Sequence, residues 1–169
     1  RVAALGIDGL VIHGRTVDQK YRGKADWQVP AEVKRRFSHL TVVGSGDLFD
    51  VATVLDRLRT SGLDGVAIAR GAVGNPWLIR GVRAALEGRP LPPAPTIEEQ
   101  RRVILWHFEA VLRLHRPERR AVGFFRKFMV GYAKRHPQRK RVLMTMLAAK
   151  TRDQFLAGLD QWYSEKAGG

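Results

Sequence analysis

The 169-residue sequence contains no cysteine, only five histidines and no long apolar run. The absence of cysteine excludes disulfides, thiolate metal sites and a cysteine nucleophile within this chain. Because the five histidines are scattered, we predict no metal site. Charged residues interrupt every hydrophobic stretch, so we predict no membrane span, and the first residues lack the pattern of a cleaved signal peptide.

Acidic residues are also scarce relative to basic ones. The 30 lysines and arginines outnumber 16 aspartates and glutamates, which gives a formal net charge of +14. The excess is greatest between Arg113 and Arg141, where Glu118 is the single acid. A surface that serves solubility normally mixes both signs, so this excess favours a polyanionic partner, namely nucleic acid. The groove-reading motifs of DNA-binding proteins and the aromatic signatures of small RNA modules are absent.

The first 88 residues alternate between apolar, β-branched runs and segments with helical spacing. We expect strands at 8–13, 40–43 and 64–69, and helices at 27–37, 47–61 and from Asn75 to just before Gly88. Apolar strands that alternate with helices predict an α/β domain with a parallel sheet. Three strands cannot close a barrel and would leave two open edges. We therefore interpret them as about strands 6–8 of a TIM-type barrel, and the sequence as a piece of a longer protein.

A proline-rich segment separates this region from a second, helical one. Four prolines among residues 89–95 predict a stiff linker. Residues 96–169 then show four amphipathic helical segments, which predict a small all-α bundle. Their expected starts are Thr96, Pro117, Gln138 and Thr151. In the second helix, the expected packed face is Ala121, Phe124, Phe125, Phe128 and Tyr132, and the expected polar face is Arg119, Arg126, Lys127 and Lys134. The predicted domains are thus 1–88 and 96–169, joined by 89–95.

Glycine and polar residues follow each expected strand. The segments are His13–Gly14–Arg15–Thr16, Gly44–Ser45–Gly46–Asp47 and Ala69–Arg70–Gly71. Backbone N–H groups at such turns can approach an anion closely, and an arginine can bind it in bidentate fashion, so these segments predict a phosphate site. The alternatives at each segment are a plain turn and a structural histidine. The third glycine of the dinucleotide fingerprint is missing, and nothing indicates acyl transfer.

Together these motifs resemble the carboxyl-terminal half of bacterial tRNA-dihydrouridine synthases, closest to the B-type branch. The matching stretches are Ile12–Thr16, Tyr21–Trp27, Gly44–Asp47, Ile68–Trp77 and Phe125–Lys127. Singly none of them is specific, but their order and spacing together are. The sequence departs from the family pattern at Ser45, Ala69 and Phe128, where the family commonly has asparagine, glycine and histidine.

The resemblance implies a cytoplasmic flavin enzyme that reduces uridine in tRNA to 5,6-dihydrouridine, with FMN as cofactor and NADPH as reductant. The proton-donating cysteine of the family belongs to the half that is not in this chain, so no catalytic residue is assigned here and the fragment alone is expected to be inactive. The implied FMN-binding residues are His13, Ser45, Gly46, Asp47, Ala69 and Arg70. The implied tRNA-binding residues are Arg15, Arg126 and Lys127.

Two other functions remain open on the sequence alone. One is an FMN barrel oxidoreductase that acts on a small molecule, which would have no need of a basic helical bundle. The other is a non-catalytic RNA-binding protein with a degenerate half barrel, which the substitutions at Ser45 and Ala69 favour slightly.

Overall fold

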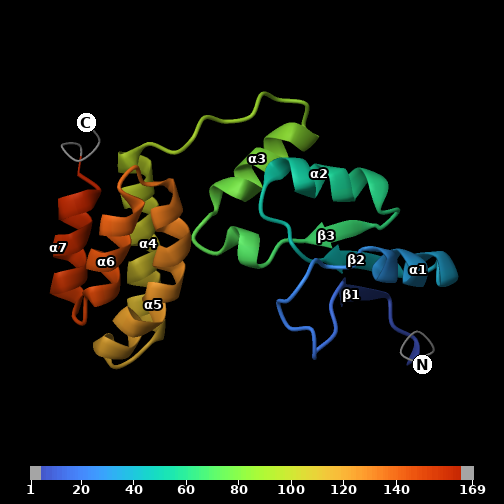
Figure 1. The fold of residues 1–169 in the computed structure, drawn as a ribbon, viewed down its shortest axis with the longest axis horizontal. Helices are drawn as coiled ribbons and strands as arrows, with labels where there is room; N and C mark the ends of the chain where they lie inside the picture. The colour runs from blue at the N-terminus through green and yellow to red at the C-terminus, as the bar shows by residue number, and fades with distance from the viewer. Residues whose placement is uncertain (1–4, 165–169) are drawn as a thin grey trace. The chain divides into compact units, whose positions relative to one another are not determined.

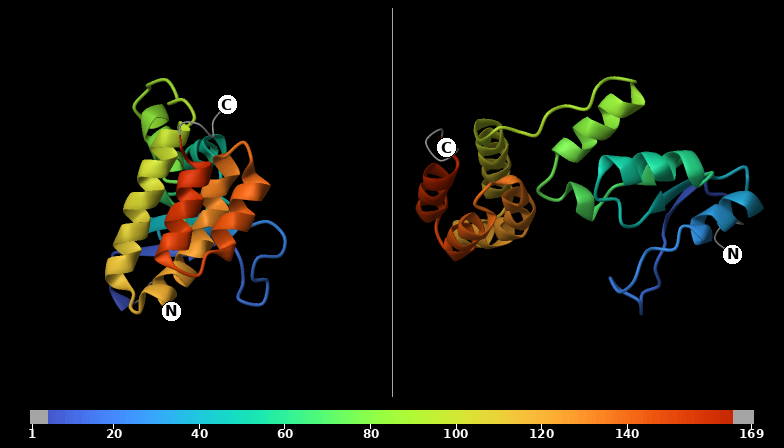
Figure 2. Two further views of the ribbon diagram at one scale, coloured as in Figure 1. Left: turned by 90° about the vertical axis from the view of Figure 1, so that its left-hand side faces the viewer. Right: turned by 45° about the horizontal axis from the view of Figure 1, so that its top comes forward.

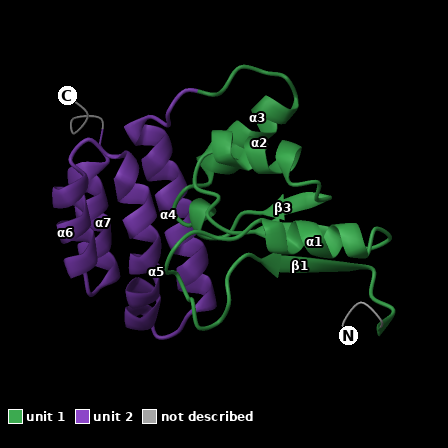
Figure 3. Cartoon of the chain, turned by 45° about the vertical axis from the view of Figure 1, so that its right-hand side comes forward, with its two compact units in different colours: residues 1–92 green, residues 93–169 purple. Residues whose placement is uncertain are grey.

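The computed structural model describes residues 5–164 and divides the chain into two compact units, Arg1–Pro92 and Pro93–Gly169. Figure 3 shows the two units in different colours. Their boundary falls within the proline-rich segment 89–95. The four prolines of this segment disfavour both helix and central strand, which explains why the chain passes here from one unit to the other. Each unit is described by itself below.

Unit 1 is an α/β unit in which strands and helices alternate (Figure 1). Its elements are β1 (Gly9–His13), α1 (Gln28–Arg36), β2 (Thr41–Ser45), α2 (Val51–Thr60), β3 (Gly65–Ala67), the short 3-10 helix η2 (Arg70–Ala72) and α3 (Trp77–Leu86). The strands form one parallel sheet in the order β1-β2-β3. The α/β class and the parallel sheet expected from the sequence are therefore confirmed.

Local signals set the two ends of α2, with one error in our expectation. Gly62 has a φ of +69°, as expected of a glycine that follows the end of α2. The predicted start of α2 at Asp47 is wrong, because Asp47 lies in a loop with a φ of +52°. Asp50 caps the helix instead: its carboxylate accepts a hydrogen bond of 2.8 Å from the backbone N–H of Thr53.

The two faces of the sheet differ in how they are covered. On one face, Val42, Gly44 and Val66 lie beneath the helices, where Trp27, Val54 and Leu78 form the centre of an apolar cluster. The other face carries Val11, Val43 and Ser45, and Val11 is 69% exposed. Trp27, which directly precedes α1, and residues of α2 and α3 contribute to this one cluster. Within the described residues, no such cluster covers the opposite face.

Unit 2 is built from four α-helices with short connections (Figures 1 and 2). They are α4 (Ile97–Leu114), α5 (Glu118–Tyr132), which continues into the 3-10 helix η3 (Ala133–Arg135), α6 (Arg139–Ala148) and α7 (Arg152–Trp162). Thr96 and Thr151 cap α4 and α7, as their position before the apolar runs predicted. Among residues 5–164, no helix is long and apolar enough to cross a membrane.

The core of unit 2 is aromatic and fully closed. Phe108 of α4 and Phe155 of α7 stack with their ring centroids 4.0 Å apart, and Phe125 of α5 packs against both, at 5.2 and 5.4 Å. All three are at most 1% exposed. The expectation that Phe124 belongs to this packed face is wrong, because Phe124 is 36% exposed. The buried face of α5 is instead Ala121, Val122, Phe125, Met129 and Tyr132.

Candidate functional site

The carboxyl ends of the three strands bring the predicted cofactor residues together. In the sheet register, His13 pairs with Ser45 and Ser45 pairs with Ala67, so these residues form a row across the last step of the sheet. They lie on the face that lacks helical cover, because side chains alternate along each strand. The end of a parallel sheet is where ligand sites of α/β proteins occur.

A small hollow lies at this edge of the sheet. It is lined by His13, Ser45, Gly46, Asp47, Leu48, Phe49, Ala67, Ala69, Arg70 and Gly71. All six residues that the resemblance assigned to the cofactor are among them. Leu48 and Phe49 were missed, because nothing in the sequence distinguishes these apolar residues from a turn into the next helix.

Glycine is required at two positions of this hollow for reasons of space. A Cβ on Gly46 would lie 2.4 Å from the Cβ of Ala25, and the φ of +140° at Gly46 also disfavours other residues. A Cβ on Gly71 would lie 1.9 Å from the carbonyl oxygen of Leu48. The glycines thus let neighbouring backbone segments pack closely around the hollow.

Asp47 is the centre of a hydrogen-bond network beside the hollow. Its carboxylate accepts hydrogen bonds from Nη2 of Arg15 at 2.9 and 2.7 Å, and from the backbone N–H of Ala25 at 2.8 Å. Nη2 of Arg70 lies 3.3 Å from the same carboxylate. Two arginines therefore share the negative charge of one aspartate.

The network determines the protonation of Asp47. Partial burial alone raises the pKa of this carboxyl, but the hydrogen bonds from Ala25 and Arg15 and the charges of Arg15 and Arg70 outweigh it and hold the pKa below its ordinary value. Asp47 is therefore ionised at neutral pH. Asp47 does not cap the following helix, because its carboxylate is turned to the arginines and Asp50 is the cap.

Arg70 is held at the rim of the hollow but remains accessible. Its guanidinium carbon lies 4.2 Å from the ring centroid of Tyr21 and 5.4 Å from that of Phe49. Its side chain is 41% exposed. Aromatic rings and a carboxylate thus orient the guanidinium, while the exposed part can donate hydrogen bonds to an anion.

Arg15 is not at the surface, although the resemblance implied that it contacts RNA. Its side chain is 3% exposed. Besides its bond to Asp47, it donates hydrogen bonds to the carbonyl oxygens of Arg22 and Gly23, at 3.4 and 2.7 Å. The arginine therefore connects the segment after β1 to the end of β2. Its direct contact with RNA stays an untested prediction.

The other two predicted RNA-binding residues lie on α5 in unit 2 and differ from each other. Lys127 is exposed, and its Nζ lies 3.6 Å from the ring centroid of Phe124. Arg126 is half-buried and donates a hydrogen bond from Nη2 to the carbonyl oxygen of Ala149, just after α6. The expectation that both lie on an exposed polar face is wrong for Arg126, because this side chain holds the end of α6.

Two histidines of unit 2 have internal partners. His136 accepts a hydrogen bond at Nδ1 from the backbone N–H of Gln138, and its Nε2 lies 2.6 Å from the carbonyl oxygen of Trp162. Nδ1 of His107 lies 3.0 Å from the hydroxyl of Tyr132. Burial lowers the pKa of His107. Within residues 5–164, no group of side chains is arranged to hold a metal ion.

Comparison with known proteins was consistent with the motif pattern. The profile of the family described as "Dihydrouridine synthase (Dus)" matches residues 1–167. A "Probable tRNA-dihydrouridine synthase" of Mycobacterium tuberculosis (strain H37Rv) is 34% identical over 158 residues, which are 94% of this chain and 40% of that protein. The "tRNA-dihydrouridine synthase B" of Xanthomonas axonopodis pv. citri is 35% identical over 152 residues, which are 90% of this chain and 45% of that protein.

The chain thus spans about two fifths of the length of the curated relatives that it matches. The family profile nevertheless covers nearly every residue. On this match, the chain belongs to the dihydrouridine synthase family.

Proposed function

We propose that this chain is the carboxyl-terminal part of an FMN-dependent enzyme that reduces uridine in tRNA to 5,6-dihydrouridine. The observation that carries the proposal is the hollow at the strand ends, where Arg70 is accessible to an anion in a chain whose relatives are named tRNA-dihydrouridine synthases. No catalytic residue is assigned within this chain.

The sheet supports placing unit 1 in a larger barrel. Its strands follow one another in chain order, Trp27 and the helices α2 and α3 pack on one face, and the opposite face carries the exposed Val11. A doubly wound sheet has helices on both faces, whereas a barrel has helices only outside. We therefore propose that Val11 and Val43 face the interior of a TIM-type barrel of which β1 to β3 form one part.

The residues at the hollow fit the phosphate end of FMN. Arg70 would hold the phosphate by charge-assisted hydrogen bonds, and the turns at Gly46 and Gly71 would bring backbone N–H groups near it. The carboxylate of Asp47 does not face the phosphate as an unpaired anion, because Arg15 and Arg70 neutralise it. When bound and reduced by NADPH, FMN supplies the hydride that reduces the uracil ring.

Unit 2 would bind the tRNA. Residues 96–169 carry 16 basic and 7 acidic residues. An excess of cations attracts the phosphate backbone independently of sequence and makes binding strongly dependent on salt. An oxidoreductase for a small molecule would gain nothing from this charge, which is why we favour the tRNA substrate.

The experiment is an assay of the complete enzyme that ends in this chain. We expect purified protein to contain FMN, seen by its visible absorbance, and to form dihydrouridine in tRNA with NADPH. A protein that binds tRNA but never flavin would instead be the non-catalytic RNA-binding alternative. A flavoprotein that oxidises NADPH but leaves tRNA unmodified would indicate a small-molecule substrate.

A further inference from the structure

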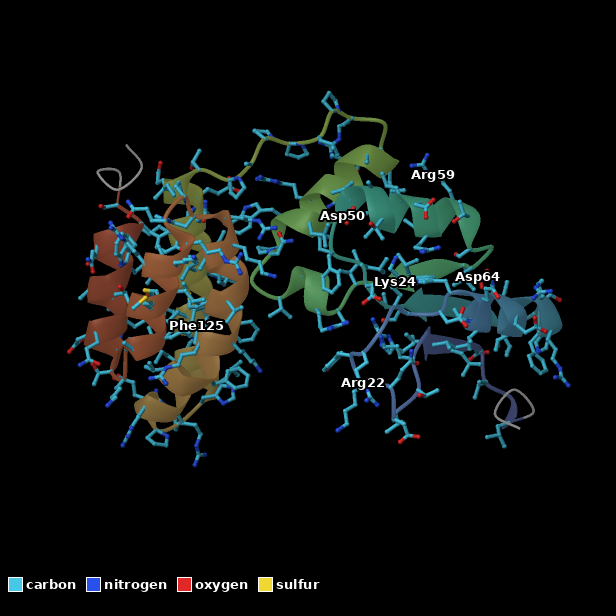
Figure 4. All side chains as sticks on the ribbon, viewed as in Figure 1. Arg22, Lys24, Asp50, Arg59, Asp64 and Phe125 are labelled. Carbon is cyan, nitrogen blue, oxygen red and sulfur yellow. The ribbon has the colours of Figure 1, made fainter. Side chains whose placement is uncertain are left out.

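Two aromatic rings near the carboxyl ends of the strands are exposed, although each is large. Tyr21 lies between β1 and α1, next in the chain to Arg22 (Figure 4), and is 71% exposed. Phe49 lies between β2 and α2, next to the helix cap Asp50 (Figure 4), and is 49% exposed. Both rings lie outside the buried apolar cluster of unit 1. Packing in the core therefore does not account for a ring at either position.

Both rings lie against the guanidinium of Arg70. Its carbon Cζ is 4.2 Å from the ring centroid of Tyr21 and 5.4 Å from that of Phe49. These distances are within the range in which the face of a ring attracts a cation. Arg70 follows β3, whereas Tyr21 follows β1 and Phe49 follows β2. The segments after all three strands thus meet at one guanidinium.

An aromatic ring can restrain an arginine without consuming its hydrogen-bond donors. The ring attracts the cation through its π-electrons, while the N–H groups lie in the plane of the guanidinium and point outward from its edge. Asp47 accepts a hydrogen bond from Nη2, and the side chain of Arg70 is still 41% exposed. The rest of the edge can therefore donate to a phosphate. An arginine that is already held loses less side-chain entropy on binding, which favours higher affinity.

We propose that Tyr21 and Phe49 are positioning residues for the phosphate group of the flavin nucleotide, because their rings hold the guanidinium of Arg70 at the hollow before the phosphate binds. The inference rests on the proposed FMN site. The two rings act through Arg70 and need no contact of their own with the cofactor.

The first test removes each ring in the complete enzyme and measures FMN affinity by fluorescence titration of the apoenzyme. Tyr21→Leu and Phe49→Leu should each weaken FMN binding about two- to fivefold, as expected for the loss of one exposed cation–π contact. The loss should be larger for Tyr21, whose ring is nearer to Arg70. Tyr21→Phe keeps the ring and should bind FMN like the wild type.

The matched control is Phe37→Leu. Phe37 also lies beside an arginine, with its ring centroid 5.7 Å from Cζ of Arg36, but it follows α1 and precedes β2. This pair is therefore at the amino end of the strands, away from the hollow, and Phe37→Leu should leave FMN affinity unchanged.

The second test asks whether the rings act through Arg70 and the phosphate. Riboflavin has the ring system and ribityl chain of FMN but no phosphate, so Tyr21→Leu and Phe49→Leu should leave riboflavin affinity unchanged. In enzyme that already carries Arg70→Ala, adding Tyr21→Leu should not weaken FMN binding further, because the guanidinium that the ring holds is gone. A ring that only supports the fold would weaken binding in both backgrounds.

The outcomes separate this inference from the proposed function. If both leucine variants bind FMN like the wild type while Arg70→Ala does not, the positioning role is wrong and the FMN site stands. If Tyr21→Phe loses as much affinity as Tyr21→Leu, or if riboflavin binding falls equally, the positioning role is also wrong. If wild-type enzyme binds no FMN, both proposals are wrong. Circular dichroism checks the folding of each variant, and if one does not fold, the variant at the other ring still decides the role.

Discussion

The two units of this chain bury their apolar side chains to different extents. Unit 2 encloses Phe108 and Phe125 completely, each 0% exposed. Unit 1 covers only one face of its sheet, and Val11 on the other face is 69% exposed. Unit 2 thus has a core of its own, whereas the sheet of unit 1 leaves apolar surface that a partner would cover. The predicted cofactor residues lie at the end of this incompletely covered sheet.

The largest expected effect concerns the closed core. Phe125→Ala should lower the free energy of unfolding of unit 2 by about 3–5 kcal/mol, because the ring packs against Phe108 and Phe155 and its removal leaves a cavity. Chemical denaturation followed by circular dichroism measures it. Phe124→Ala is the matched control, since this neighbouring phenylalanine is 36% exposed and should cost far less. Equal losses from the two substitutions would contradict the assignment of the packed face.

A smaller effect is expected at the uncovered face. The chain of 169 residues should self-associate through its sheet, and Val11→Lys should weaken that association on the order of tenfold by placing a charge in the apolar face. Sedimentation velocity measures it. Val17→Lys, at a loop position that is 91% exposed, is the control. A monodisperse wild-type monomer would show that unit 1 needs no partner.

The smallest effect is a pH dependence of unit 2. Burial lowers the pKa of His107, so the unfolded chain binds the proton more readily than the folded one. Stability should therefore be fully present above about pH 6.5, the ordinary pKa of histidine, and decline as the pH falls below it. Unfolding midpoints between pH 5 and pH 8 test this. His107→Gln should flatten the decline; an equally steep decline in this variant would assign the effect to another group.

The sequence predicted the parts of the fold that depend on local chemistry. Thr96 and Thr151 cap their helices as expected, and Gly62 follows the end of α2 in the left-handed conformation. These outcomes follow from hydrogen bonds and backbone preferences within one turn of the helix. The strands β1, β2 and β3 were also found within two residues of their predicted ends.

Features that depend on distant contacts could not be predicted in the same way. In the sequence, Asp47 and Asp50 are equally suitable as helix caps. Asp50 is the cap in the structure, because the carboxylate of Asp47 is bound by Arg15, which is 32 residues away. The sequence predicts that Arg126 is a surface cation, but in the structure this arginine donates a hydrogen bond to the carbonyl oxygen of Ala149, 23 residues away. The Tyr21 ring next to Arg70 likewise depends on how the loop folds back. A sequence pattern gives the residue types of a site but not which of them pair.

In the proposed function, the strand ends of unit 1 bind the flavin while the cations of unit 2 bind tRNA. It is tested most directly by measuring FMN affinity and the salt dependence of tRNA binding in the complete enzyme carrying Arg70→Ala or Lys127→Ala. Arg70→Ala should weaken FMN binding by about 1.5–3 kcal/mol and leave the tRNA salt slope unchanged. Lys127→Ala should lower that slope by roughly 0.7–0.9 and leave FMN binding unchanged. Full FMN affinity in Arg70→Ala, or an unchanged slope in Lys127→Ala, would contradict this division of binding between the two units.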